Sequence, residues 1–76
     1  MVPKRYIVLR RILGGRIRDL RRRRGWSQND LAALCELSTH HLGKIERGAA
    51  NATLATLLPI AKVLKTSLAS LFKGLP

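Results

Sequence analysis

The chain has 76 residues, about half of an ordinary domain, so we expect one small core and no second domain. Fifteen Lys and Arg residues outnumber four acidic ones, and the formal net charge of +11 indicates a polyanionic partner. A hydrophobic content of 46% excludes a disordered basic tail, and the single cysteine, Cys35, excludes an internal disulfide framework.

Neither a signal peptide nor a membrane span is predicted. Arg10 and Arg11 interrupt the first apolar stretch after Leu9, which leaves it too short for a signal-peptide core. The longest uncharged segment, residues 48–61, is shorter than the roughly 20 apolar residues of a spanning helix. We therefore expect an intracellular, cytoplasmic protein without a membrane partner.

Apolar residues at steps of four, four and three predict a helical face formed by Leu9, Leu13, Ile17 and Leu20. Gly14 and Gly15 weaken that helix, because each costs about 1 kcal/mol relative to alanine. We therefore predict a short basic N-terminal arm over residues 1–12 and a domain over residues 13–76. Its first helix begins at about Leu13 and ends before Gly25.

The second predicted helix begins at Ser27. Ser27 and Asp30 are spaced as an acidic variant of the capping box, and Trp26 and Leu31 occupy the positions of a hydrophobic staple. Cys35 falls on the inner face of this helix, so we assign it to the core rather than to a nucleophilic role.

A third helix is predicted from the Ser38 cap to Arg47, with Gly48 as its left-handed exit. Leu42 and Ile45 point inward. The opposite stripe is polar or small and consists of Thr39, His40, Gly43, Lys44 and Arg47. The adjacent His40 and His41 diverge by about 100° on a helix, so we predict no metal site there.

Two more helices complete the chain. The fourth follows a Thr53 cap, and its predicted buried face is Leu54, Leu57, Ala61 and Leu64. The fifth is capped by Thr66 or Ser67, carries Leu68, Leu71 and Phe72, and ends at Gly74. Because no alternating strand pattern is present, the predicted fold class is all-α with five helices.

Two short capped helices joined by a tight turn form the layout of a helix-turn-helix. The outer face of the second of these helices would enter the major groove of DNA. The N-terminus of the first would attract a phosphate, assisted by the Gln28 amide. The sequence has no carboxylate pair, activated nucleophile or phosphate-binding glycine loop, so we predict that the protein is not an enzyme.

Residues 16–21, 26–32 and 44–48 carry a specific family pattern, including Ser27-Gln28, Leu31-Ala32 and Ile45-Glu46-Arg47-Gly48. On these motifs the chain resembles the XRE-type, or phage-repressor-like, helix-turn-helix domain over about residues 13–73. The resemblance implies a compact five-helix, lambda-repressor-like fold, double-stranded DNA as partner, no cofactor, and the cytoplasm of a prokaryote or phage.

The resemblance also implies roles for individual residues. Thr39, His40 and Lys44 would contact bases, and the phosphate contacts would come from Gln28, His41, Arg47 and Arg16. Arg21 and Glu46 would form a partly buried ion pair between the first and third helices. The residue pattern agrees, because Glu46 lies on the inward side beside Leu42 and Ile45 and needs a cation there.

The chain length and the pattern after Gly48 resemble the controller proteins of restriction-modification systems, which implies a homodimer through the fourth and fifth helices. The predicted dimer interface is Leu64, Leu68, Leu71 and Phe72. Such a dimer predicts an operator with inverted-repeat half-sites about one DNA turn apart. We therefore expect a transcriptional regulator.

Three features depart from the family pattern. Glu36 stands where a turn glycine is usual, and a left-handed conformation there would cost about 1 kcal/mol. Gly43 removes a side chain from the recognition face. Ala49 and Ala50 replace residues that in relatives are often basic or polar.

Two alternative functions remain open. One is an antitoxin-type DNA-binding protein with a toxin partner, and the other is a cationic membrane-active protein using residues 4–24. Residues 1–24 hold ten basic residues and one acidic residue, so +9 of the net charge lies there, and residues 25–76 contribute +2. The charge therefore favours general phosphate attraction by the N-terminal part, and sequence selection must depend on a few weakly charged side chains.

Overall fold

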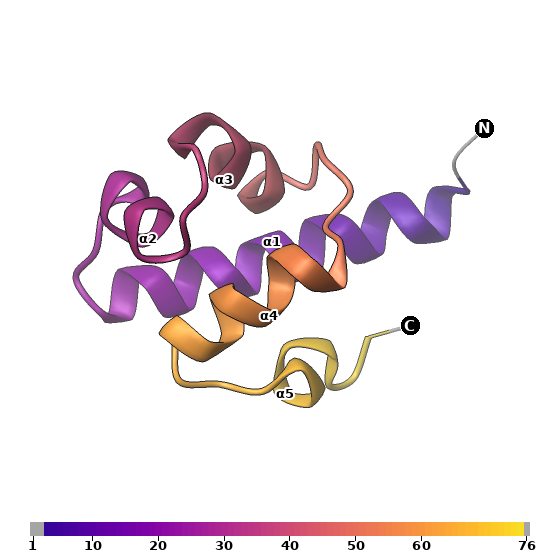
Figure 1. The fold of residues 1–76 in the computed structure, drawn as a ribbon. Helices are drawn as coiled ribbons and strands as arrows, with labels where there is room; N and C mark the ends of the chain where they lie inside the picture. Colours follow the sequence, from indigo (N-terminus) through magenta and orange to yellow (C-terminus); the bar gives the residue numbers. More distant parts are fainter. Residues whose placement is uncertain (1–2, 76) are drawn as a thin grey trace.

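The computed structural model describes residues 3–75. Five helices follow in this range: α1 (Lys4–Arg23), α2 (Gln28–Leu34), α3 (Thr39–Glu46), α4 (Leu54–Val63) and α5 (Leu68–Phe72). In the view of Figure 1, α1 crosses the molecule, α2 and α3 lie above it, α4 passes in front of it and α5 lies below. The predicted all-α, five-helix architecture is confirmed, with no strand among the described residues.

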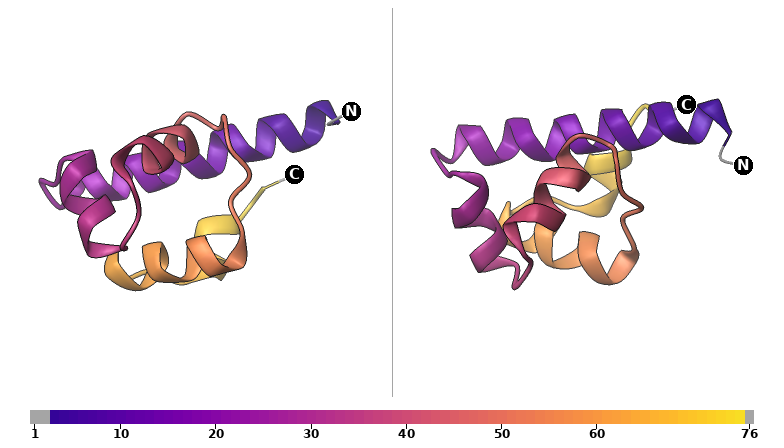
Figure 2. Two further views of the ribbon diagram at one scale, coloured as in Figure 1. Left: turned by 45° about the horizontal axis from the view of Figure 1, so that its top comes forward. Right: turned by 90° about the horizontal axis from the view of Figure 1, so that it is seen from above.

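The first helix is longer than predicted. It starts at Lys4, and Figure 2 shows its N-terminal turns projecting past the other helices. The prediction of a separate arm over residues 1–12 is therefore wrong from Lys4 onward, and residues 1 and 2 lie outside the described part. A domain boundary between residues 12 and 13 would cut a continuous helix.

Gly14 explains why the glycine pair does not end this helix. A Cβ built on Gly14 would meet the carbonyl oxygen of Ile45 and would lie 2.6 Å from that of Glu46, so the glycine allows the backbone of α3 to approach α1 closely. The packing and the continuous backbone hydrogen bonds of α1 offset the helix penalty of two glycines, about 1 kcal/mol each.

Serine caps begin α2 and α3 as predicted. The amide of Asp30 donates to Ser27 Oγ at 3.1 Å, and the amide of Ser27 donates to the Asp30 carboxylate at 2.8 Å. The amide of His41 donates to Ser38 Oγ at 3.0 Å. In the turn between the two helices Glu36 has a φ of 57°, so the strained left-handed conformation is present.

Acidification should weaken the cap of α2. Hydrogen bonds from the Ser27 backbone amide and side chain lower the pKa of Asp30 in the folded protein. The stability that the Asp30 carboxylate contributes is therefore fully present above the unfolded pKa of about 3.9. It is lost as the pH falls through the lower pKa of the folded state. We expect Asp30→Asn to lower the melting temperature at pH 7, and we expect this difference from the wild type to shrink below about pH 4. Thermal unfolding followed by circular dichroism from pH 7 to about pH 2.5 measures it. Asp19→Asn, the same change of charge, is the control, and a pH-independent effect of Asp30→Asn would contradict the prediction.

Side-chain caps also begin the last two helices. The Thr56 amide donates to Thr53 Oγ1 at 3.2 Å, and the Ser70 amide donates to Ser67 Oγ at 3.0 Å. Of the two predicted caps for α5, the structure therefore uses Ser67.

The predicted buried face of α4 is correct except at its start. Leu57, Ala61 and Leu64 are buried, whereas Leu54 is 64% exposed. Leu54 is the first residue of α4, and the buried residues of this helix begin one turn later, at Leu57. Ile60, which is fully buried, contributes to the core in its place.

The core is formed by side chains from all five helices and from the residues that cap them. It consists of Leu13, Ile17, Leu31, Ala32, Cys35, Leu42, Ile45, Leu57, Ile60, Ala61, Leu64 and Leu71. Cys35 belongs to this core, as predicted, and burial raises the pKa of its thiol. In the part of the chain that the structure describes, no helix has the length and apolar character that crossing a membrane requires.

Candidate nucleic-acid interface

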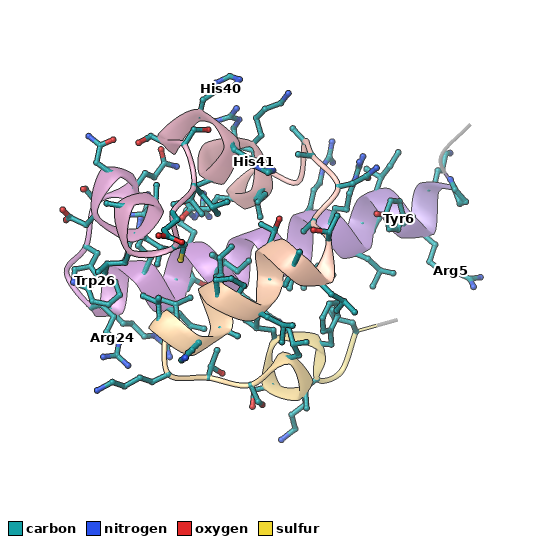
Figure 3. The ribbon with its side chains drawn as sticks, viewed as in Figure 1. Arg5, Tyr6, Arg24, Trp26, His40 and His41 are labelled. Carbon is teal, nitrogen blue, oxygen red and sulfur yellow. The ribbon has the colours of Figure 1, made fainter. Side chains whose placement is uncertain are left out.

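The outer side of α3 carries a set of polar side chains, here called the recognition face: Thr39, His40, His41, Lys44 and Arg47. Leu42 and Ile45 are 0% and 2% exposed and hold the opposite side of the helix in the core. His40, Lys44 and Arg47 are separated by four and three residues, so they share one side of the helix. Figure 3 shows His40 directed away from the body of the molecule. The recognition face contains no acidic residue.

Thr39 is bonded to the preceding helix. Its hydroxyl donates to Asn29 Oδ1 at 2.5 Å, which joins the first turn of α3 to the first turn of α2. Asn29 is not among the residues predicted from the sequence, although its position directly after Ser27-Gln28, in the first turn of α2, places it close to the predicted phosphate contact. Asn29 is exposed, and its hydrogen bond with Thr39 places it at the edge of the recognition face.

Gly43 is not part of the exposed stripe, and that prediction is wrong. It is buried under the start of α2, where an added Cβ would lie 3.5 Å from Gln28 Oε1 and 3.1 Å from an Arg47 guanidinium nitrogen. The glycine therefore makes room for the Gln28 side chain between α2 and α3. Gly43 therefore allows α2 and α3 to pack closely, and it does not remove a side chain from the recognition face.

The predicted ion pair between α1 and α3 is present. Arg21 Nε and Nη2 donate to the two carboxylate oxygens of Glu46 at 2.7 and 3.0 Å. The side chains are 8% and 1% exposed, and Arg21 Nη1 also donates to the Trp26 carbonyl at 2.7 Å. The hydrogen bond to Glu46 is the main cause that raises the pKa of Arg21 above its usual value. This pair fixes the end of α3 on α1.

Gln28 completes the same network. Its amide nitrogen donates to Glu46 Oε1 at 3.0 Å, so part of its hydrogen-bonding capacity is used inside the protein. The capping box of Ser27 and Asp30 likewise uses two amides at the start of α2. A phosphate at this helix start would therefore be held by what remains of the Gln28 amide and by the backbone amides of Gln28 and Asn29.

Arg16, a predicted phosphate contact, has a structural role in the protomer. Its Nη1 donates to the carbonyls of Leu71 and Lys73, at 2.9 and 2.6 Å, and so holds the end of α5. Two residues along a helix correspond to a rotation of about 200°, so Arg16 faces α5 while Gly14 faces α3. A contact between Arg16 and phosphate would have to use its other guanidinium nitrogens, and it stays a prediction.

Two of the arginines at the end of the first helix, buried Arg21 and exposed Arg24, also donate hydrogen bonds to other parts of the protein. Arg21 pairs with Glu46, and Arg24 donates to the Leu64 carbonyl at 3.1 Å, with its guanidinium 5.7 Å from the Trp26 ring centroid. Arg22 and Arg23 are exposed.

The predicted dimer interface needs revision. Leu64 and Leu71 are 3% and 1% exposed because they are part of the core of a single protomer, so the prediction is wrong for these two residues. Leu68 is half-buried and Phe72 is 42% exposed. The other large exposed apolar side chains on α4 are Leu54 and Leu58, at 64% and 53%.

Three residues near the end of α3 form a group that sequence reasoning missed. Tyr6 and Arg10 on α1 both donate to Asn51 Oδ1, at 3.2 and 2.9 Å. The partners are more than 40 positions apart, and no local pattern marks such a contact.

A family model described as a helix-turn-helix domain matches residues 12–71. The control protein C.SmaI of Serratia marcescens is 35% identical over 66 residues, which cover 87% of this chain and 79% of that protein. The transcriptional regulator RamB of Mycobacterium tuberculosis is 43% identical over 51 residues, or 67% of this chain, and the chain spans only 11% of RamB.

Among solved structures, the restriction-modification controller protein C.AhdI from Aeromonas hydrophila superposes with a TM-score of 0.78 at 37% identity. The match covers 82% of this chain and 94% of C.AhdI. The similarity therefore extends over nearly the whole length of a controller protein.

Proposed function

The chain belongs to the helix-turn-helix domain family, and from this membership we propose that it is a transcriptional regulator that binds a specific double-stranded DNA operator as a homodimer. The observation that carries the proposal is the recognition face, an acid-free polar surface on which His40 and Arg47 are exposed and Thr39, His41 and Lys44 are half-buried. Leu42, Ile45 and the buried Arg21–Glu46 pair hold it on the core.

In the proposed complex α3 enters the major groove. Thr39, His40 and Lys44 contact base edges, and Lys44 suits the acceptor atoms of guanine. Gln28, His41 and Arg47 contact phosphates beside the groove and set the register of the helix. The +9 charge of residues 1–24 adds general attraction to the DNA backbone, which falls as salt rises.

The proposed dimer uses the exposed apolar side chains of α4 and α5. Leu54, Leu58 and Phe72 are each more than 40% exposed in the protomer, and Leu68 lies half-buried on α5. Covering such side chains with a second copy removes apolar surface from water. A twofold dimer presents two α3 helices about one DNA turn apart, so we expect an inverted-repeat operator.

More specifically, we propose that the protein controls the genes of a restriction-modification system. Its support is that the chain covers 79% of C.SmaI and 94% of C.AhdI, both described as control or controller proteins. Longer relatives such as RamB share only the part of their chain that this domain spans.

Selection of bound duplexes from a random pool at about 0.15 M salt tests the proposed function. We expect enrichment of an inverted repeat, and we expect Lys44→Ala to relax the preference at one position of each half-site. Arg18→Ala, at an exposed position of α1, removes the same charge away from α3 and from the proposed dimer surface; it is the matched control and should leave the preference unchanged. Tight binding without enrichment would show attraction to the backbone alone. Release from DNA by anionic vesicles, or co-purification of a monomer with a second polypeptide, would favour the membrane-active or antitoxin function instead.

A further inference from the structure

The N-terminal turns of α1 are joined to the segment that follows the recognition helix, residues 48–53, here called the exit loop. Tyr6 Oη and Arg10 Nη1 both donate to Asn51 Oδ1 in this loop. The Arg10 guanidinium also lies 5.2 Å from the centroid of the Tyr6 ring, within range of a cation–π contact. One loop oxygen is thus bound by two side chains of one helix. Figure 3 labels Tyr6 on the N-terminal turns of α1.

The backbone reinforces this connection at Gly48. Gly48 has a φ of 72°, and an added Cβ would lie 2.8 Å from the backbone nitrogen and Cα of Arg11. The exit loop therefore begins in direct contact with α1. The amides of Gly48 and Ala49 donate back to the carbonyls of Ile45 and Lys44, at 3.0 and 2.8 Å, which ties the loop to the last turn of α3.

Asn51 differs from its two neighbours in how it is held. Ala50 and Ala52 are packed against the core and line a pocket of about 200 Å³ beside Leu9 and Leu13 of α1. Asn51 is exposed, and its side chain is held by the hydrogen bonds from Tyr6 and Arg10. Arg10 Nε is buried without a hydrogen-bond partner among the described residues, so the guanidinium has lost water on that side. The bond from its Nη1 to Asn51 lies on the exposed side of the guanidinium and joins a charged donor to an amide oxygen.

We propose that Tyr6 and Arg10 are positioning residues that act through Asn51: they brace the exit loop and the end of α3 against α1, and so order this end of the recognition face before DNA binds. The inference deepens the proposed function, and rests on it only for the DNA-binding part. The brace acts on Lys44 and Arg47, because Lys44 lies in the last turn of α3, to which the loop is bonded, and Arg47 is the C-cap residue of that helix. Because the end of α3 is already ordered in the free protein, binding to DNA does not include the entropic cost of ordering it.

Tyr6→Phe and Asn51→Ala test the brace without changing the net charge. Hydrogen exchange of the free protein should show faster exchange at the Gly48 and Ala49 amides, by about three- to tenfold, with the Ile17 amide in the core unchanged. The Kd for the selected operator should rise by about three- to tenfold in each variant. Val8→Ala, an uncharged change at an exposed position of the same helix, is the control and should alter neither.

The double variant separates bracing from direct contact with DNA. If Tyr6 acts through Asn51, adding Tyr6→Phe to Asn51→Ala should raise the Kd no further, because the acceptor is already gone. Multiplicative losses would mean that Tyr6 acts independently of Asn51 and would overturn the proposal. Unchanged exchange at Gly48 and Ala49, or faster exchange with an unchanged Kd, would overturn it as well. A wild type that selects no duplex would refute the proposed function, while the exchange measurement would still decide whether the brace exists.

Discussion

Glu46→Ala should destabilise the protein by about 3 to 5 kcal/mol, because it leaves the guanidinium of Arg21 buried without its anion. The substitution also removes the acceptor of the Gln28 amide. Domains of this kind have a total stability of about 5 to 15 kcal/mol, so a large fraction of the molecules should unfold at moderate temperature. Urea unfolding followed by Trp26 fluorescence measures the change.

The double variant Arg21→Met/Glu46→Ala tests the reason for this loss. Because it removes both charges together, it should recover part of the stability lost in Glu46→Ala alone. Glu46→Gln, which keeps the shape and the polar oxygen, should fall between the wild type and Glu46→Ala. A loss below about 1 kcal/mol for Glu46→Ala would mean that the pair behaves as a solvated surface ion pair.

Gly14→Ala should separate α1 from α3, although it adds only one methyl group. The new Cβ would lie 2.6 and 2.8 Å from the backbone oxygen and carbon of Glu46, and closer still to the carbonyl oxygen of Ile45. Backbone atoms cannot turn aside as a flexible side chain can, so one helix must shift. We expect a loss of about 1 to 3 kcal/mol or more, and weaker binding to every operator because α3 is displaced.

The neighbouring glycine provides a matched control. Gly15 has nothing within 4 Å of an added Cβ, so Gly15→Ala should stabilise α1 by up to about 1 kcal/mol. Opposite signs for the two substitutions in the same urea unfolding experiment are the expected result. A stabilising effect at both positions would show that α3 does not approach α1 as closely as the structure indicates.

The first helix positions the recognition helix at three places along its length. α3 is held on α1 by the glycine contact at Gly14, by the ion pair at Arg21 and by the exit loop beside Arg11. The helix that would read DNA therefore takes its orientation from α1 along its length. Substitutions on α1 should alter DNA binding without touching the recognition face.

Local chemistry explains which structural features could be predicted. The caps at Ser27, Ser38 and Thr53 each join residues three positions apart, so the sequence spacing is sufficient to predict them. The same holds for the inward side of α3. The Arg21–Glu46 pair spans 25 positions, and it was predicted because the family resemblance placed both residues and because an inward carboxylate needs a cation.

The features that sequence reasoning missed depend on contacts between distant parts of the chain. Gly14 and Gly15 look alike in the sequence, and only the approach of α3 distinguishes them. Leu64 and Leu71 have the same apolar character as Leu58 and Phe72, but only the packing of α4 and α5 places the first two inside the protomer.

Residue spacing within one or two turns is sufficient to predict the number of helices, the caps of α2, α3 and α4 and most of the polar side of α3. Helix packing sets three further features that such spacing does not reveal: Arg16 holds α5, Asn51 is bound by Tyr6 and Arg10, and α1 continues to Lys4. The physical reason is that burial and long-range hydrogen bonds are set by how helices cross, and no local pattern encodes which of several similar side chains meets a partner 40 or more positions away.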